Sequence, residues 1–444
     1  MKHAEVLKKI TPSKTEASGA KKLAESTRKA LKKHLPKGVK TLLAGSVAKG
    51  TFLRGAGDID IFAIFPVSYS KEEMFKKLEK AAKKAFPRAQ RETGYAEHPY
   101  LRIYLKKKRI DLVPSYKMEE GERVKSAVDR SQLHTKYVLS KMKAAQKKEV
   151  LLLKQFLKAN LLYGAEIKTK GFSGYLCELM VLHYGSFEKF LKAASMWKLP
   201  VVIDQEKKYT SLRAVPDFKT PLTVIDPVDL RRNVAAVITR ENLQRFMFLS
   251  AAYIAEPSEK FFFPKTMSLE ELEEKTEGRN IFALVLDVPK TGLVSDKLAE
   301  DVLWGQLWRL SGQLESYLKK AEFNLLGIHP YKTDSDCVIL FELRSPVLPK
   351  TQTFRGPYLD QTEHVSVFMR KRSKPFFFDH GRIHSLGKRK LWNISLAIKE
   401  FRKRKNAPSH MAGAQKAKLF AKESILEDYP EALEEYFRIN WFPA

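Results

Sequence analysis

The first 116 residues alternate between helical and strand-like patterns of apolar side chains. Residues 3–35 have the Ala, Lys, Leu and Glu content of a helix, interrupted at Ser18-Gly19, and residues 70–86 form an amphipathic helical pattern that Ser70 opens. Strand patterns occur at residues 41–44, 58–65, 100–105 and 109–113. This stretch therefore predicts a small mixed α/β unit with three or four strands.

The remainder of the chain divides into a helical middle and a mixed last part. Helical periodicity runs from residue 133 to residue 191 and returns at residues 240–254, with short apolar runs near Val201 and Val224. Pro257 and Pro264 then bracket a boundary. Beyond it the pattern predicts a strand, a helix and two strands, at residues 280–288, 298–320, 323–329 and 337–343. This order is typical of an α+β sandwich, a fold that often binds RNA on its sheet.

Composition narrows the class of protein. The 444 residues are 44% hydrophobic, which excludes global disorder, and no run of apolar residues is long enough to span a membrane. Residues 1–15 carry four lysines and lack the apolar core of a signal peptide. Cys177 and Cys337 alone cannot form a zinc site or a disulfide framework. We therefore expect a soluble protein of the reducing cytoplasm.

The charge balance indicates a polyanionic partner. Lys and Arg number 81 against 51 acidic residues, a net charge of +30. Residues 366–405 hold 13 Lys or Arg and only two acids, and the first 40 residues form a second basic region. Aromatic residues 376–378 and Trp392 are interleaved with the first cluster. We expect the basic block to bind RNA and the aromatic side chains to belong mainly to the core.

Three carboxylates are candidates for metal binding. Asp58 and Asp60 project from the same face of a predicted strand because strand side chains alternate. Asp111 lies in another predicted strand, and if the two strands are neighbours the three acids converge. Such acids raise one another's pKa unless a divalent cation neutralises them, and hard oxygen ligands suit Mg²⁺. Two such ions about 3.5–4 Å apart support phosphoryl transfer. The alternative is that the acids only mark a solvated strand end.

A Gly-Ser turn precedes this strand. Gly45 allows close approach of the backbone to a ligand, and Ser46 is placed to cap a helical turn. With Lys49 and Arg54 nearby, the turn is expected to form a phosphate cradle. The dipeptide alone carries little information, and its value lies in its spacing to Asp58.

The order Gly-Ser, Asp-x-Asp and a later Asp resembles the nucleotidyltransferase superfamily that includes DNA polymerase β. More specifically, the chain is similar to the archaeal, class I CCA-adding tRNA nucleotidyltransferases. The matching segments are residues 43–51, 58–62, 95–100, 110–114, 125–130, 171–179, 226–229 and 232–236. They cover about the first 260 residues, and beyond them residues 355–357 are the best anchor.

The resemblance implies the fold and the reaction. It predicts an α/β and α+β multidomain protein with a polymerase β-like nucleotidyltransferase head (residues 1–136), a mainly helical central domain for nucleotide selection (137–260) and an α+β body with a basic tail that binds tRNA (261–444). The activity implied is template-independent addition of C, C and A to the tRNA 3′ end from CTP and ATP, with two Mg²⁺ ions. A homodimer is expected only by analogy with the family.

The resemblance also assigns roles to residues, in four sets. Asp58, Asp60 and Asp111 match the metal-binding, catalytic carboxylates. The residues that match nucleotide contacts are Ser46 and Lys49 (phosphates), His134, Lys154 and Tyr163 (triphosphate and nucleotide) and Arg232 (base edge). The sequence departs from the family pattern twice, with Lys49 where Arg is common and Asp58 where Glu is frequent. Taken alone, His134, Lys154, Tyr163 and Arg232 would be ordinary cap, surface or helix-end residues.

Two other functions remain open from the sequence. A poly(A) or oligoadenylate polymerase uses the same kind of catalytic carboxylate triad. The segments around Tyr95, Gly171 and Asp226 argue against this alternative. A catalytically silent tRNA-binding protein is the other alternative. The presence of all three carboxylates argues against that second alternative.

Overall fold

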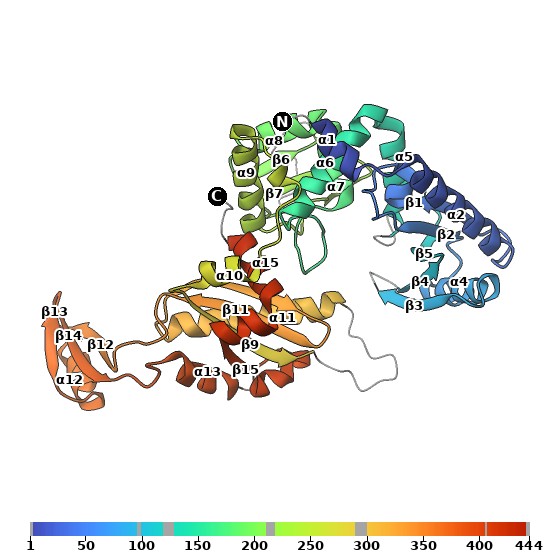
Figure 1. The fold of residues 1–444 in the computed structure, drawn as a ribbon. Helices are drawn as coiled ribbons and strands as arrows, with labels where there is room; N and C mark the ends of the chain where they lie inside the picture. Colours follow the sequence, from blue (N-terminus) through green and yellow to red (C-terminus); the bar gives the residue numbers. More distant parts are fainter. Residues whose placement is uncertain are drawn as a thin grey trace. The chain divides into compact units, whose positions relative to one another are not determined.

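The computed structural model describes residues 3–95, 99–118, 128–209, 218–288, 300–404 and 406–440 (Figure 1). The chain divides into two compact units, Met1–Lys265 and Thr266–Ala444. No helix within the described ranges combines the length and the apolar character that a membrane crossing requires. Residues 96–98 and 125–127 of the family-like segments, Leu298 and Ala299 of the predicted helix, and Lys405 lie outside the described residues.

The first unit begins with two helices and a five-stranded sheet. The helices are α1 (His3–Ile10) and α2 (Lys14–Lys32), and the sheet has the order β1-β2-β5-β4-β3. The bounds of its strands are β1 Lys40–Ala44, β2 Ile59–Phe65, β3 Gln90–Tyr95, β4 Pro99–Leu105 and β5 Lys108–Tyr116. Strands β2 and β5 are parallel, and the other neighbours are antiparallel. The structure has one strand more than expected, because the polar edge strand β3 has no apolar alternation to reveal it.

Two helices cover one face of this sheet. Helix α2 and helix α4 (Lys71–Ala85) pack on Ile59, Ile61, Ala63 and Phe65, the odd-numbered positions of β2. Ser70 caps α4 with the predicted capping box. The even-numbered positions, Asp60 among them, therefore point to the face that α2 and α4 leave uncovered.

The predicted interruption of the first helix is wrong in position. The break occurs at residues 11–13, where Ser13 caps α2 by accepting a hydrogen bond from the Glu16 amide, while Gly19 lies inside α2. Pro12 cannot continue a helix because it lacks an amide hydrogen, whereas a helix tolerates a glycine at a modest cost.

A helical layer and a small sheet complete the first unit. The helices are α5 (Arg130–Lys141), α6 (Ala144–Ala159), α7 (Gly174–Tyr184), α8 (Phe187–Ala194), α9 (Arg240–Ala255) and the short η2 (Glu259–Phe261), while α3 (Gly45–Lys49) packs with the first sheet. The sheet β6-β7-β8 comprises Val201–Ile203, Leu222–Asp226 and Asp229–Asn233. Val6 and Ile10 of α1 lie in the same core as α6 and α9, so the first helix packs with the helical layer. The predicted domain boundary at residue 136 stays a prediction.

The second unit is an α+β sandwich, as predicted, and its antiparallel sheet has helices on both faces. Its strand order is β10-β11-β9-β15. The strands are β9 (Asn280–Asp287), β10 (Leu325–Lys332), β11 (Asp336–Leu343) and β15 (Lys418–Ala421). One face packs on α11 (Glu300–Lys320), α13 (Ile394–Arg402) and η3 (Ser409–Lys416). The other packs on α10 (Leu269–Thr276), α14 (Lys422–Asp428) and α15 (Pro430–Asn440).

A small basic module is inserted into this second unit. Strands β12 (Thr351–Tyr358), β13 (Phe376–Asp379) and β14 (Arg382–Lys388) form a sheet in the order β12-β14-β13, with α12 (Thr362–Lys371) against β12. The expectation that the aromatic run belongs to the core is wrong here, because Phe377 is 36% exposed and Phe378 is 68% exposed. They lie on an edge strand of a sheet too small to be covered on both faces.

Candidate active site

The parallel pairing of β2 with β5 brings two of the predicted carboxylates together. Asp60 and Asp111 are register partners across the two strands. Asp58 immediately precedes β2 and is half-exposed, whereas Asp111 is buried. The sequence-based expectation that these strands are neighbours is thus met, and the acids gather on the face that α2 and α4 leave open.

Two arginines that the sequence analysis missed pair with these acids. Arg102 donates from Nε and Nη2 to the two oxygens of Asp111 at 2.9 and 3.2 Å, and Arg109 Nη2 lies 2.5 Å from Asp58 Oδ2. The pairing of Arg102 with Asp111 could have been predicted from the hairpin of residues 100–113. Its turn places Leu105 opposite Lys108, and that register puts Arg102 opposite Asp111.

Asp60 is the carboxylate with the most strongly altered acidity. Loss of solvent around it raises its pKa from 3.8 to about 7, and the negative charges of Asp111 and Asp58 act in the same direction. Arg109 and Lys49 lower it only in part. The arginines of the site therefore do not balance the negative charge around Asp60.

These residues fit a divalent cation. The donors are hard carboxylate oxygens, and their mutual repulsion is the property that a bound cation relieves. Among the described residues no group of three or more His, Cys, Asp or Glu side chains is arranged to hold a metal ion by itself. The carboxylates therefore suit an ion that also takes ligands from water or substrate phosphates, as Mg²⁺ does.

Gly45 shapes the edge of this site. It begins α3 directly after β1 with φ of +68°, and a Cβ built on it would lie 1.8 Å from Oδ2 of Asp60. Only glycine satisfies both requirements. Half-buried Ser46 follows at the same turn. Arg54, expected in a phosphate cradle, instead donates to the carbonyls of Lys8 and Thr11 at 2.8 and 3.0 Å.

A second cluster gathers three more predicted residues around Glu178. The buried carboxylate of Glu178 accepts from Lys49 Nζ at 2.5 Å and from Thr51 Oγ1 at 2.6 Å, and Lys154 Nζ lies 3.9 Å away. Lys154 also donates to the Thr51 carbonyl at 2.8 Å. Two buried ammonium groups thus share one carboxylate, which leaves an excess of positive charge.

Tyr163 belongs to the same cluster by position. A Cβ built on Gly174, the first residue of α7, would lie 3.1 Å from Tyr163 Oη and 3.4 Å from Lys154 Nζ. Burial raises the pKa of Tyr163 and lowers that of Lys154. Glu178 was not among the predicted site residues, although a carboxylate inside an otherwise apolar helix, at residues 174–184, was an available signal.

A third cluster holds the remaining predicted residues, His134 and Arg232. Oδ2 of the buried Asp226 accepts from His134 Nε2 at 2.9 Å and from Arg232 Nη1 at 2.8 Å. Oδ1 accepts from Tyr175 Oη at 3.2 Å and from the Val228 amide at 3.1 Å. The rings of His134 and Tyr175 stack with centroids 3.8 Å apart.

Arg232 also lines a cavity of about 490 Å³. Ser173, at the N-terminus of α7, and Asn233 contribute to its wall. Arg130 and Asp229, an ion pair at 3.0 Å, line it too. The cavity has room for a small organic group beside the Asp226 cluster.

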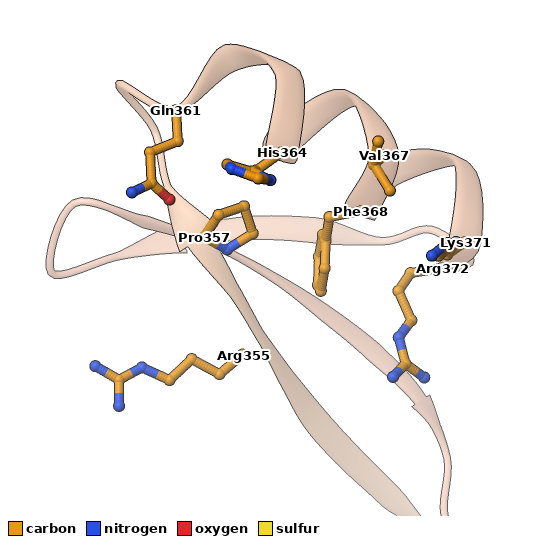
Figure 2. A pocket seen from close by; sticks show the side chains of 8 residues that line it. All are labelled: Arg355, Pro357, Gln361, His364, Val367, Phe368, Lys371 and Arg372. Atoms are coloured by element: carbon orange, nitrogen blue, oxygen red, sulfur yellow. The ribbon is translucent and has the colours of Figure 1, made fainter.

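The basic module of the second unit has a pocket of its own. Its volume is about 660 Å³, and Figure 2 shows His364 and Phe368 of α12 beside β12, which carries Arg355 and Pro357. Lys371 and Arg372 close one end. Among the described residues no acid forms an ion pair with Arg355, Lys371 or Arg372, so their charge is available to a polyanion.

Comparison with known proteins identifies the family. Family models match the chain at residues 24–134 (nucleotidyltransferase domain), 148–263 (tRNA nucleotidyltransferase, second domain) and 277–411 (CCA-adding enzyme, C-terminal domain). The CCA-adding enzyme of Saccharolobus shibatae is 35% identical over 396 residues, 89% of this chain and 90% of that protein. The chain belongs to the CCA-adding enzymes.

Other members of the family match at similar levels. The CCA-adding enzyme of Methanocaldococcus jannaschii is 35% identical over 386 residues, 84% of each chain. Among solved structures, the Cid1 poly(U) polymerase covers 59% of this chain and 94% of its own, with 14% identity and a TM-score of 0.46. Membership in the CCA-adding enzymes makes this chain a nucleotidyltransferase.

Proposed function

We propose that this chain builds and repairs the 3′-terminal CCA of tRNA from CTP and ATP without a nucleic-acid template. The relatives are named CCA-adding enzymes, and this chain matches them over 84–90% of their length. The observation that carries the proposal within the structure is the pairing of Asp60 with Asp111 beside the Gly45 turn. A silent RNA-binding protein would have no use for this charged arrangement.

The carboxylate cluster is proposed to activate the primer. Asp58, Asp60 and Asp111 would hold Mg²⁺, which supplies charge stabilisation to the phosphates and lowers the pKa of a bound hydroxyl. Asp111 faces the attacking ribose hydroxyl, and the two bonds from Arg102 set the orientation of its oxygens. Asp111 takes the proton of the ribose hydroxyl, the hydroxyl oxygen bonds to the α-phosphorus, the α–β phosphoanhydride bond breaks, and pyrophosphate leaves.

The Glu178 cluster is proposed to hold the triphosphate. Ser46 lies at the turn, and Lys49, Lys154 and Tyr163 stand around Glu178. Because two lysines share one carboxylate, their residual positive charge suits a phosphate chain. Holding the nucleotide in line with the primer supplies much of the catalysis in this reaction class.

Nucleotide selection is proposed for the Asp226 cluster. Arg232 borders the cavity in which a base can lie, and His134 provides a contact to the triphosphate or nucleotide. Arg232 lies in the central region, residues 137–260. We therefore propose this region, rather than the catalytic head, as the part of the chain that selects CTP and ATP.

The basic second unit is proposed to hold tRNA, from the 3′ end along the acceptor arm. Arg355, Lys371 and Arg372 offer cations without acidic partners among the described residues, and Phe378 offers an exposed aromatic face. A homodimer acting in the cytoplasm completes the proposal, on family analogy alone.

The test is an extension assay read at single-nucleotide resolution. Purified protein, Mg²⁺ and a tRNA transcript that lacks its last three nucleotides are given CTP, ATP or both, beside an Asp58→Ala, Asp60→Ala variant. We expect two additions with CTP, a third only when ATP is also present, and none from the variant. A long adenylate ladder would contradict the proposal in favour of a poly(A)-type polymerase. Tight tRNA binding without extension would indicate a silent binding protein.

A further inference from the structure

Asp226 occupies the centre of the third cluster without reaching solvent itself. It is fully buried at the end of β7, and its two oxygens accept four hydrogen bonds. The donors come from four places in the fold: His134 on α5, Tyr175 on α7, Arg232 on β8 and the amide of Val228 in the turn. Asp226 therefore acts on a ligand only through the groups that it holds.

The charges in this cluster favour an ionised Asp226. Burial acts to raise its pKa, but the hydrogen bonds from His134 and Arg232 and the charge of Arg232 outweigh burial, and the net effect is a lowered pKa. Burial lowers the pKa of His134. A carboxylate that only accepts hydrogen bonds thus holds a guanidinium that only donates them.

One side of the Arg232 guanidinium is bound and the other is available. Nη1 donates to Asp226 at 2.8 Å, and among the described residues Nε and Nη2 have no hydrogen-bond partner. Arg232 also lines the cavity of about 490 Å³. Its position along the cavity wall is therefore set by the bond to Asp226.

The position of the Arg232 guanidinium determines which bases can form a hydrogen bond with it. Cytosine and adenine present a ring nitrogen acceptor beside an exocyclic amino group, whereas uracil and guanine present a ring N–H beside a carbonyl oxygen. A guanidinium held at the ring nitrogen meets an acceptor in C and A but another donor in U and G. A guanidinium free to swing could donate to the carbonyl of U or G instead, and the discrimination would fall.

We propose that Asp226 is a positioning residue that holds Arg232 and His134 in place and thereby determines the selection of C and A over U and G. This inference rests on the proposed function of the chain and goes beyond the assignment of Arg232 to the base edge. Asp226 itself makes no contact with the nucleotide.

The experiment compares Asp226→Asn with wild type in kcat/KM for each of the four nucleotides. Asparagine keeps the size but removes the charge and one acceptor, and loss of a charged hydrogen bond corresponds to roughly 10- to 100-fold. We expect the C-over-U and A-over-G ratios to fall by about tenfold or more. Glu342→Gln is the matched control, since Glu342 is also a buried carboxylate held by an arginine and a tyrosine, in the second unit.

A double-mutant cycle separates positioning from a general loss of structure. In an Arg232→Ala background, Asp226→Asn is expected to change the ratios less than twofold, because Arg232, the group through which Asp226 affects base selection, is gone. Equal losses for all four nucleotides, or unchanged ratios in Asp226→Asn, would overturn the proposal. If that variant does not fold, Tyr175→Phe removes one bond from Asp226, and unchanged ratios there overturn it too. A wild type that adds no nucleotide refutes the proposed function instead.

Discussion

At the scale of single residues, Gly45 shows how one missing side chain shapes the site. Its φ of +68° and the 1.8 Å approach of Asp60 Oδ2 to its Cβ position are two separate constraints. Gly55 offers a matched control, because its φ is +78° but nothing lies within 4 Å of its Cβ position.

We predict that Gly55→Ala loses about 1 kcal/mol of stability, the cost of a left-handed alanine, and that Gly45→Ala loses more because its methyl group also meets Asp60. Only Gly45→Ala is expected to lose nucleotidyl transfer, by about 100-fold, because its methyl group displaces Asp60. Thermal unfolding and single-turnover extension measure the two effects. Equal activity in both variants would show that the close approach to Asp60 has no role.

His134 supplies a pH dependence of stability. Burial lowers its pKa below 6.5, with Asp226 opposing and Arg232 and Lys49 adding to the shift. The folded protein therefore prefers the neutral ring, while the unfolded chain binds a proton below pH 6.5, so stability falls as the pH falls through that value. We predict a steeper loss of melting temperature between about pH 7.5 and about pH 5.5 for wild type than for His134→Gln. Parallel curves would contradict this.

At the scale of elements, buried polar bonds join the head to the helical layer. Lys49 of α3 and Thr51 after it meet Glu178 of α7, and Lys154 of α6 donates back to the Thr51 carbonyl. In contrast, the ion pair between Lys9 of α1 and Glu259 is exposed. Both pairs join distant parts of the first unit, but only one is shielded from water.

We predict that Glu178→Gln destabilises the protein by about 3–5 kcal/mol, because two buried ammonium groups lose their counter-charge. Lys9→Ala is expected to cost about 1 kcal/mol or less. Denaturant unfolding of the two variants measures the difference. A Glu178→Gln loss as small as that of Lys9→Ala would show that the lysines are neutral or hydrated in the fold.

At the scale of the whole molecule, the excess of 30 positive charges favours binding to a polyanionic partner. The basic module concentrates part of this charge where acidic partners are lacking among the described residues, at Arg355, Lys371 and Arg372. Exposed Phe377 and Phe378 in the same module offer rings to unstacked bases.

We predict that replacing Arg355, Lys371 and Arg372 together by alanine weakens tRNA binding and lowers the slope of log affinity against log salt by up to about 3. Removing three exposed lysines of α4, Lys76, Lys77 and Lys80, takes away the same charge and is the control. Titration of labelled tRNA at several salt concentrations measures both. Equal slopes in the two variants would mean that net charge, and not this module, holds the RNA.

Local sequence patterns predicted most of the helices and strands, and they placed Asp58 and Asp60 on the same face of one strand. Alternation specified β2 with Asp60 on the face opposite Ile59 and Ile61, and Ser70 specified the start of α4, because side-chain period and capping act over a few residues. The resemblance to a family supplied the function. Strand β3 and the exposed Phe378 escaped prediction, because edge position is a property of the whole sheet.

Only the tertiary structure decided how charges are shared. Glu178 meets Lys49 across 129 residues and Asp226 meets His134 across 92, distances over which no local pattern operates. A buried carboxylate must take whichever donors the packing brings to it, since an unpaired one is too costly. The sequence thus determined which residues can carry the chemistry, and long-range packing decided which of them are held by Glu178 and which by Asp226.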